Sequence, residues 1–422
     1  MLIEFQVENF RSFRERQVFS MVASHFAEHR DSNTFSAAIK GFDPLVRTAV
    51  IYGANASGKT NLLLAMNFMK NFVATSAAVT AAYPFSPFKL AKKCAKRPSH
   101  FQIAFVQDAM RYEYGFSMGA AHIEKEWLVE YAHVGKRARG RAMFERTWNG
   151  AGKKFDWKFS TFLKGQKDVW AKATRPNALF LSTAIQLNGT QLQPVFDWFL
   201  KKLVVIVGPI TLNESLTLSL LDHPDGREKL LPFLREADLG IADVHIKKEP
   251  IPAGGALVLN KAPLLQASPQ TNAAHVVTVT MSHIAENNEG IGIDLSEEST
   301  GTQLLFKTAG AWLNVLANGE ILVLDEIDSN MHPALLKFLI DRFHSAKTNP
   351  NNAQLICSTH NTSILQKSMF RRDQIWFVEK GRDGASKVYP LTDFNPRSDE
   401  SFERAYMRGQ YGAQPILPSS VD

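Results

Sequence analysis

An eight-residue segment, residues 53–60, constrains this chain more than any other feature. It fits the phosphate-binding pattern G-x-x-x-x-G-K-[ST] at all four fixed positions. A β-rich apolar stretch, Val46 to Tyr52, leads into it, and a segment with helical spacing of apolar residues follows from Lys59 to about Val73. This strand–loop–helix context is the one that gives the pattern its meaning. The loop consists of Gly53, Ala54, Asn55, Ala56, Ser57, Gly58, Lys59 and Thr60.

The loop has the residue types that phosphate binding requires. Small side chains let backbone N–H groups surround phosphates, and the start of the following helix favours their negative charge. Lys59 supplies a positive charge to the outer phosphates of a bound nucleotide, and the Thr60 hydroxyl suits a Mg²⁺ ligand. A glycine-rich turn with a purely structural role is the alternative.

A second motif combines a buried strand with two carboxylates. Four apolar residues, Ile321 to Leu324, predict a central strand, and Asp325 and Glu326 follow at its carboxyl end. Ligands of open α/β sheets bind at that edge. We expect Asp325 to hold Mg²⁺ and Glu326 to orient or deprotonate an attacking water. An acidic pair that merely ends a strand is common, so this interpretation depends on the upstream loop.

A third motif, residues 295–303 (LSEESTGTQ), opens a predicted helix. Ser299 at the helix N-cap, followed by Gly301, would leave backbone N–H groups available to a γ-phosphate. The alternative is a simple capping box with no ligand. The position of the motif, about twenty residues before the acidic strand, favours the ligand-binding interpretation.

Composition limits the class of protein. With 48 basic and 41 acidic residues the chain has a net charge of +7, which permits contact with DNA. The basic runs Lys89 to Arg97 and Lys136 to Arg146 do not alternate with aromatic residues in the way that a binder of single-stranded nucleic acid would show, so a solvated surface explains them as well. No stretch approaches the roughly 20 apolar residues of a membrane helix. Two distant cysteines, Cys94 and Cys357, suit a reducing compartment, so we expect a cytoplasmic protein without membrane contact.

The pattern of predicted elements divides the chain into four parts. Residues 1–190 contain the phosphate-binding loop, residues 53–60, which is called the P-loop from here on. They also contain several segments whose sequences predict antiparallel strands. Residues 191–289 are predicted to form a compact insertion. In residues 290–391 the pattern again predicts helices that alternate with strands. Residues 392–422 form a polar tail with Arg404, Tyr406 and Tyr411, whose role the sequence does not indicate.

The order of the motifs resembles that of ABC-type ATPases, particularly their SMC and RecF-like branch. The motifs are, in order, the P-loop, Ser299-Thr300-Gly301, Asp325-Glu326, Asp328-Ser329 and His360. The opening residues 8–13 (ENFRSF) are similar to the start of that branch. The third motif differs from the standard L-S-G-G-Q signature by carrying glutamate and threonine, which leaves its register open.

This resemblance implies specific roles. Ser299 and Gly301 would belong to a signature loop that contacts ATP held by the P-loop of the other subunit. Asp328 and Ser329 would lie in a loop that crosses the dimer interface. His360, which follows a predicted apolar strand, would be the switch histidine at the γ-phosphate.

A narrower resemblance covers almost the whole chain. The segments at 112–116, 126–128, 179–182, 298–302, 372–377 and 411–415 look like those of RloA- and AbiL-type bacterial ATPases. Such AAA-family ATPases are typically encoded beside a second protein and serve phage defence or abortive infection. The resemblance implies a sensor or scaffold that controls a toxic partner effector, often a nuclease.

The sequence leaves the roles of two further candidate site residues undecided. A glutamine that contacts magnesium is expected between the first part and the insertion, and Gln186 is the candidate, with Gln191 close behind. A polar loop residue without a role is the alternative for both. Arg11 follows the first predicted strand and would contact nucleotide phosphate or base, unless it is an ordinary surface arginine.

The expected fold class is therefore α/β, an ABC-type P-loop ATPase head. It has a mixed sheet in its first lobe, an α/β second lobe and an inserted, mainly helical subdomain. Two chains should sandwich two ATP molecules with Mg²⁺ in a C2 homodimer, or in a higher oligomer built of dimers. Three alternatives are a DNA repair or recombination ATPase, a scaffold in which ATP is only a clamp, and the nucleotide-binding subunit of a membrane transporter.

Overall fold

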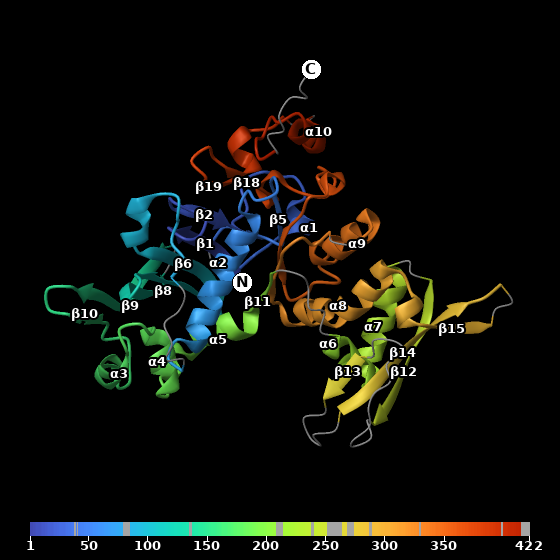
Figure 1. Cartoon of the computed structure of the whole chain (residues 1–422), viewed down its shortest axis with the longest axis horizontal. Coiled ribbons are helices and arrows are strands. Elements are labelled where there is room, and N and C mark those ends of the chain that lie inside the picture. Colours follow the sequence, from blue (N-terminus) through green and yellow to red (C-terminus); the bar gives the residue numbers. More distant parts are fainter. Residues whose placement is uncertain are drawn as a thin grey trace. The chain divides into compact units, whose positions relative to one another are not determined.

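The computed structural model divides the chain into two compact units. The first contains Met1–Gly208, Leu316–Ile327 and Leu339–Asp422, and the second contains Pro209–Val315 and Asp328–Phe338. The structure describes residues 1–37, 39, 41–78, 85–134, 137–207, 214–237, 240–250, 264–267, 274–286, 289–328, 331–397 and 400–414. Figure 1 shows the elements of both units, which are described here one at a time.

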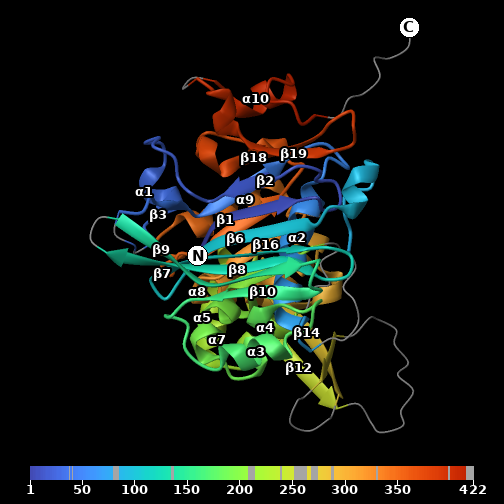
Figure 2. The ribbon, with the colours of Figure 1, turned by 90° about the vertical axis from the view of Figure 1, so that its left-hand side faces the viewer.

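The first unit contains an antiparallel sheet of seven strands, seen face-on in Figure 2. Inward-facing apolar residues alternate with outward-facing polar ones along several strands, as in a sheet with one solvated face. In spatial order the strands are β10 (Lys154–Phe159), β9 (Arg137–Asn149), β8 (Ile123–Val134), β7 (Met110–Met118), β6 (Ser99–Gln107), β1 (Leu2–Glu8) and β2 (Gln17–Ser20).

The first unit also contains a sheet of six strands, five of them parallel. Their near-continuous apolar sequences are typical of strands buried on both faces. In spatial order they are β11 (Leu203–Ile206), β16 (Ile321–Leu324), β17 (Gln354–Ser358), β5 (Thr48–Tyr52), β18 (Ile375–Lys380) and the antiparallel β19 (Ser386–Pro390). A two-stranded ribbon joins β3 (Thr34–Phe35) to β4 (Leu45–Val46).

Helix α2 (Lys59–Thr75) belongs to the same hydrophobic core as both sheets. Leu63, Met66 and Phe72 from the helix are buried with Phe5 of β1 and Ile356 of β17. A helix that contacts apolar side chains on both sides needs a wide apolar face, which its sequence LLLAMNFM provides. The other helices of this unit are α1 (Arg30–Asn33), α3 (Lys167–Ala173), α4 (Phe180–Gln186), α5 (Gln193–Asp197) and α10 (Phe402–Met407).

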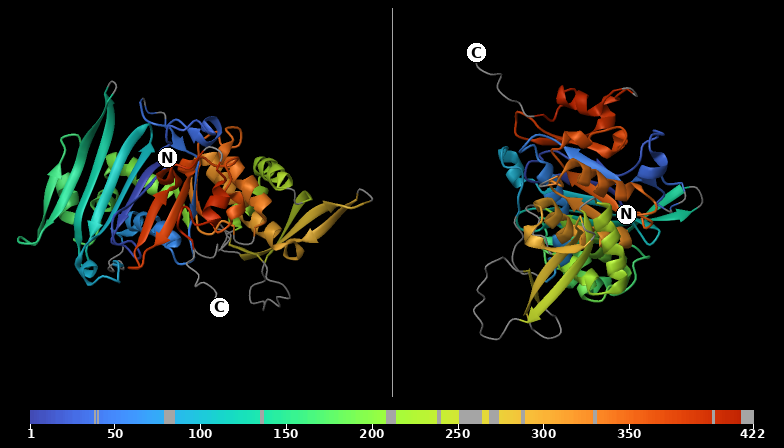
Figure 3. Two further views of the ribbon diagram at one scale, coloured as in Figure 1. Left: turned by 90° about the horizontal axis from the view of Figure 1, so that it is seen from above. Right: turned by 90° about the vertical axis from the view of Figure 1, so that its right-hand side faces the viewer.

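The second unit combines helices with a small antiparallel sheet, shown from two further directions in Figure 3. The sheet pairs β12 (Ile241–Pro250), β14 (Ala274–Ile284) and β13 (Leu264–Ala267), and β15 (Gly290–Asp294) pairs with β14. The helices are α6 (Ser215–Leu221) and α7 (Pro224–Glu236), with most of α8 (Thr300–Asn318). Helix α9 (Pro333–His344) begins in this unit and ends in the first.

The structure has the predicted α/β class, with an antiparallel sheet early in the chain and a parallel sheet that receives its later strands. The segment predicted as a mainly helical insertion also contributes the strands β12, β13 and β14. The predicted limits at 190 and 289 do not coincide with the two compact units, because β11 pairs with β16. No helix among the described residues has both the length and the apolar character that crossing a membrane requires.

Candidate nucleotide site

The P-loop connects the end of β5 to the start of α2, as the sequence predicts. Lys59 is the first residue of the helix and is only 5% exposed. Its Nζ donates hydrogen bonds to the carbonyl oxygens of Gly53, at 2.8 Å, and Ala54, at 3.1 Å. The ammonium group is therefore held over the concave side of the loop, where phosphates would bind.

Two glycines fix the shape of the loop. Gly58 has a φ of 117°, and a Cβ there would lie 2.4 Å from Ser386 Oγ and 2.9 Å from Ser12 Oγ. A Cβ on Gly53 would lie 2.3 Å from the carbonyl oxygen of Val378. The loop backbone therefore packs against neighbouring segments too closely for any side chain at these positions.

The remaining loop residues face different surroundings. Ser57 is buried, whereas Asn55, Ala56 and Thr60 are exposed. Ala56 has a φ of 59°, in the left-handed region that allows a tight loop. The Thr60 hydroxyl is thus available at the N-terminus of α2, where the predicted magnesium ligand must lie.

Asp325 and Glu326 follow β16 at the carboxyl edge of the parallel sheet. Asp325 is 7% exposed, and its Oδ1 accepts a 2.5 Å hydrogen bond from Ser358 Oγ. The Glu326 N–H donates to the same Ser358 oxygen, at 2.8 Å. Glu326 has a φ of 49° and an exposed side chain. One carboxylate is therefore fixed by the neighbouring strand, and the next projects from a strained backbone position.

His360 lies at the same edge of the sheet. It follows β17, which is the neighbour of β5, and the Thr359 N–H donates to the carbonyl oxygen of Ile51 at 3.1 Å. The Tyr52 hydroxyl donates to the carbonyl oxygen of Asn361 at 3.2 Å. Two contacts thus join the segment around the exposed His360 to the strand that leads into the P-loop.

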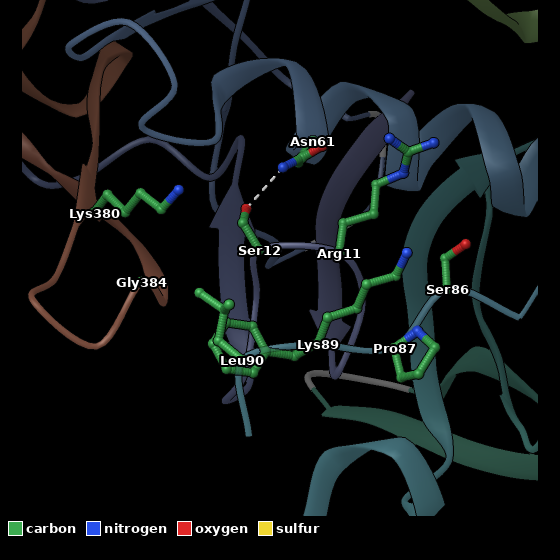
Figure 4. A pocket seen from close by; sticks show the side chains of 10 residues that line it. Arg11, Ser12, Asn61, Ser86, Pro87, Lys89, Leu90, Lys380 and Gly384 are labelled. Atoms are coloured by element: carbon green, nitrogen blue, oxygen red, sulfur yellow. Dashed lines mark hydrogen bonds between the residues drawn. The ribbon is translucent and has the colours of Figure 1, made fainter. Parts of the chain in front are cut away.

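A pocket of about 420 Å³ opens beside the start of α2 (Figure 4). Ser12 and Asn61 meet at its edge through a 2.9 Å hydrogen bond. The guanidinium of Arg11 lies 5.6 Å from the ring centre of Phe10. Lys89 and Lys380 add two positive charges to the lining. The structure therefore brings Arg11 to a basic pocket that adjoins the P-loop.

Ser299 belongs to the second unit, where it caps α8. Its Oγ accepts a 3.1 Å hydrogen bond from the N–H of Thr302 and lies 2.8 Å from the Thr302 hydroxyl. The preceding Glu298 is held by His283 of β14, with 2.6 Å between Nε2 and Oε1. Ser299 is exposed and Gly301 is half-buried in the first turn. The N-terminus of α8 is therefore exposed, and the contact between Glu298 and His283 holds the loop that precedes it.

The prediction that Gln186 contacts magnesium is not supported by its position. Gln186 is the exposed last residue of α4. This helix is attached to the far end of α2, where Ser182 Oγ donates to the carbonyl oxygen of Val73 at 2.7 Å. The 17 residues of α2 span about 25 Å, at 1.5 Å per residue. The hydrophobic contacts of α4 decide its position, and they place it away from Thr60.

Three other candidates have different outcomes. Gln191 does not reach the P-loop, because its side chain bonds to Lys164 N–H and to the carbonyl oxygen of Phe162. Asp328 is half-buried and begins the shorter segment of the second unit. Ser329 lies outside the described residues.

The residues fit a nucleotide with Mg²⁺. A Cβ at Gly53 or Gly58 would collide with neighbouring segments, so only glycine allows the tight backbone curve on which the loop N–H groups can surround a phosphate. Mg²⁺ usually takes one or two protein oxygens and completes its shell with phosphate and water. The Thr60 hydroxyl and the Asp325 carboxylate are oxygen donors of that kind.

Ser358 was not predicted as a site residue, although it lies in the apolar segment that led to the prediction of His360. A serine inside an apolar strand gives no functional signal by itself. Its importance depends on the register of β16 against β17, in which Leu324 pairs with Cys357. Ser12 and Ser386, which pack on Gly58, were missed for the same reason.

A family model described as "AAA domain, putative AbiEii toxin, Type IV TA system" matches residues 49–366. No protein with a curated description matches. A solved structure described as "Structure of the recombination mediator protein RecF-ATP in RecFOR pathway" shares 15% identity with a TM-score of 0.34, over 92% of this chain and 97% of that one. Because the family model spans most of the chain and includes the P-loop, the two carboxylates and His360, the chain belongs to this AbiEii-type family of AAA ATPases.

Proposed function

We propose that the chain binds ATP with Mg²⁺ at the P-loop and hydrolyses it to ADP and phosphate. The observation that carries this proposal is the shared edge of the parallel sheet. There the loop at the end of β5, the carboxylates after β16 and the histidine after β17 lie on three consecutive strands in space. An α/β sheet binds ligands at that edge.

Each residue has a defined task in this reaction. Backbone N–H groups of the P-loop and the ammonium of Lys59 hold the phosphates. Thr60 and Asp325 hold the metal ion, which neutralises charge on the phosphates when it is bound. Glu326 orients the attacking water and accepts its proton. His360 contacts the γ-phosphate.

The pocket around Arg11 would receive the rest of the nucleotide. It adjoins the P-loop through Ser12 and Asn61, and this position beside the phosphate-binding loop supports the proposal. Arg11 can contact a phosphate or stack on a base, since a guanidinium does both. The exposed side chain of Leu90 offers an apolar surface in the same pocket.

We further propose a C2 homodimer in which two chains share two ATP sites. Ser299 and Gly301 would complete the site of the partner chain. This agrees with a helix N-terminus that is exposed and braced, because such a terminus attracts an anion. ATP binding would then assemble the dimer and hydrolysis would release it.

The proposed cellular role is control of a partner effector in antiphage defence in the cytoplasm. It is supported by the family description, which links this AAA domain with a toxin. The effector would be encoded nearby and restrained by the ATP-dependent geometry of the dimer. The second candidate function is that of an ATPase that acts directly on DNA. It is favoured by a separate hollow lined by Arg397, Arg404 and Arg408.

The substitution Glu326→Gln tests the reaction. It removes the proton acceptor but keeps the size of the side chain, so hydrolysis should fall by at least about 100-fold. ATP binding should persist, and light scattering after size-exclusion chromatography should show a stable dimer with ATP. Glu145→Gln is a matched control, because Glu145 pairs with Lys125 and Lys158 on the antiparallel sheet. Parental turnover by the Glu326 variant would refute the assignment.

A scaffold that uses ATP only as a clamp gives a different result. Tight nucleotide binding with negligible turnover by the parental chain would favour it. Parental turnover that disappears in the Glu326 variant would exclude it.

A further inference from the structure

The segment after the last strand of the parallel sheet has no part in the proposed reaction. It contains α10 and has three arginines in its sequence. These three, Arg397, Arg404 and Arg408, line one open hollow of about 470 Å³. Arg404 and Arg408 are four residues apart and share one side of the helical turn.

The residues that the structure describes provide no ion-pair partner for these arginines. Within the residues that the structure describes, none of the three guanidinium groups makes an ion pair or a side-chain hydrogen bond. Glu400 lines the same hollow, but its two oxygens accept from the N–H of Arg397, at 3.1 Å, and from the Tyr411 hydroxyl, at 2.8 Å. Among the residues that line the hollow, three arginines therefore face one carboxylate, and an anion would relieve this excess of positive charge.

Arg404 and Arg408 lie on an anchored element, the short helix α10 and its C-terminal end. Tyr406, between Arg404 and Arg408, is 6% exposed, and its ring stacks on Phe377 of β18 at 5.4 Å. It also lies 5.8 Å from the ring of Tyr52, the last residue of β5. Figures 1 and 2 both show α10 next to β18 and β19. A site on a fixed element loses less conformational entropy on binding than one on a free tail.

The lining indicates which anion fits. Apart from the arginines and Glu400 it consists of Ser401, Ala405 and Gln410. A pocket for a small organic ligand encloses it with apolar and aromatic walls, which these residues do not provide. An open basic hollow instead suits the phosphates of a chain that passes across the surface, recognised by charge without base contacts.

We propose that Arg397, Arg404 and Arg408 form a contact site for the phosphodiester backbone of nucleic acid. The site lies outside the ATP-binding residues and reads no sequence. It supplies up to three of the phosphate contacts that the full chain makes.

The test uses the full chain without nucleotide and fluorescein-labelled DNA, single-stranded in one arm and duplex in the other, followed by anisotropy. The double substitution Arg404→Ala with Arg408→Ala removes two phosphate contacts. At 0.1 M salt it should weaken duplex binding by roughly 10- to 60-fold, and it should reduce the slope of log K against log salt by about 2. The arm with the larger loss identifies the form of nucleic acid that the site holds.

Two controls make the test specific. Arg139→Ala removes an exposed arginine from β9 of the other sheet and should leave binding within about twofold, since it changes only the overall charge. The rate of ATP hydrolysis and the midpoint of urea unfolding should stay at parental values in the double variant, which shows that it is folded.

Four results would overturn the proposal. The double variant binds both DNA forms as well as the parental chain does, or the Arg139 variant loses as much affinity as the double variant. The parental chain binds neither DNA form at low salt. Alternatively, pyrophosphate binds to the parental chain in an arginine-dependent way while neither DNA form does, which would make the hollow a small-anion site.

Discussion

Ser358 shows how one buried hydroxyl can organise the chemistry of a site. It donates to Asp325 and accepts from the backbone of Glu326, so it fixes the position of the proposed metal ligand relative to the proposed base. Ser358 is fully buried, so removing its hydroxyl would leave buried hydrogen-bonding groups of Asp325 and Glu326 without this partner.

Ser358→Ala should therefore lower kcat by about 10- to 100-fold, the effect expected from a small misplacement of catalytic groups. The affinity for ATP should change little, because the P-loop is not altered. Steady-state kinetics and nucleotide-binding titrations measure the two effects, and Ser358→Thr should restore most of kcat. Ser182→Ala removes a buried hydroxyl on α4 and is the matched control for a simple loss of stability.

The residue scale also shows what a sequence can predict. The P-loop could be predicted because its residues are consecutive and their spacing is dictated by the phosphates. Asp325 and His360 were predicted as site residues because each follows an apolar strand. Gln186 was misplaced because its position depends on how α4 packs against the end of α2, and no local pattern encodes that contact.

At the scale of elements, a buried ion pair attaches α4 to the antiparallel sheet. Glu126 of β8 and Arg146 of β9 are both fully buried, with 2.8 Å between Oε2 and Nε. Glu126 also accepts from the Tyr114 hydroxyl and from the N–H groups of Phe180 and Leu181, the first two residues of α4. One carboxylate thus joins three strands and the start of a helix.

Glu126→Gln should destabilise the chain by about 3 to 5 kcal/mol, because it leaves the buried charge of Arg146 without its partner. Replacing both residues, Glu126→Gln with Arg146→Met, should cost less than the single change, since no lone charge is then buried. Urea unfolding of both variants measures the difference. A single variant with parental stability would show that the charge of Glu126 contributes little.

The elements themselves were predicted better than their pairing. The helix from Lys59 and the strand from Ile321 to Leu324 follow from local periodicity and have nearly the predicted bounds. The neighbours of β5 could not be predicted, because β17 and β18 come some 300 residues later in the chain. The same limit applies to β1, which is inserted between β2 and β6.

At the scale of the whole molecule, one buried histidine makes stability depend on pH. Burial, with the nearby charges of His29 and Arg47, lowers the pKa of His344 to about 3. Its Nε2 lies 2.8 Å from the Thr48 hydroxyl, which itself accepts from Gln374 and so has its proton left to donate. The folded chain therefore keeps this imidazole neutral.

In the unfolded chain the same imidazole titrates near pH 6.5. Above that pH neither state binds the proton, so stability is unaffected. Below it only the unfolded chain binds the proton, and the free energy of unfolding falls by about 1.4 kcal/mol per pH unit until the folded pKa is reached. Urea unfolding between pH 6.5 and 5.0 should show this decrease, and His344→Gln should remove about 1.6 kcal/mol of it. An unchanged pH dependence in the variant would contradict the assignment.

The proposed dimer makes a prediction that no single chain can satisfy. Lys59→Ala disables the P-loop but leaves Ser299 intact, whereas Ser299→Arg places a large side chain at the exposed start of α8 and leaves the P-loop intact. Each variant alone should hydrolyse no ATP, because every site in its homodimer has one defective half. In a mixed dimer, one site combines both defects and the other combines two intact halves.

Random exchange of equal amounts makes half of the dimers mixed, each with one working site of two. The mixture should therefore recover about a quarter of the parental ATPase rate per chain, since a C2 pair exchanges equivalent subunits. The variants are mixed without nucleotide, and phosphate release is measured after ATP and Mg²⁺ are added. ATP hydrolysis by the Ser299 variant alone would show that Ser299 is not part of the ATP site. Recovery near zero, from variants that each still dimerise with the parental chain, would place both halves of the site in one chain and exclude the shared arrangement.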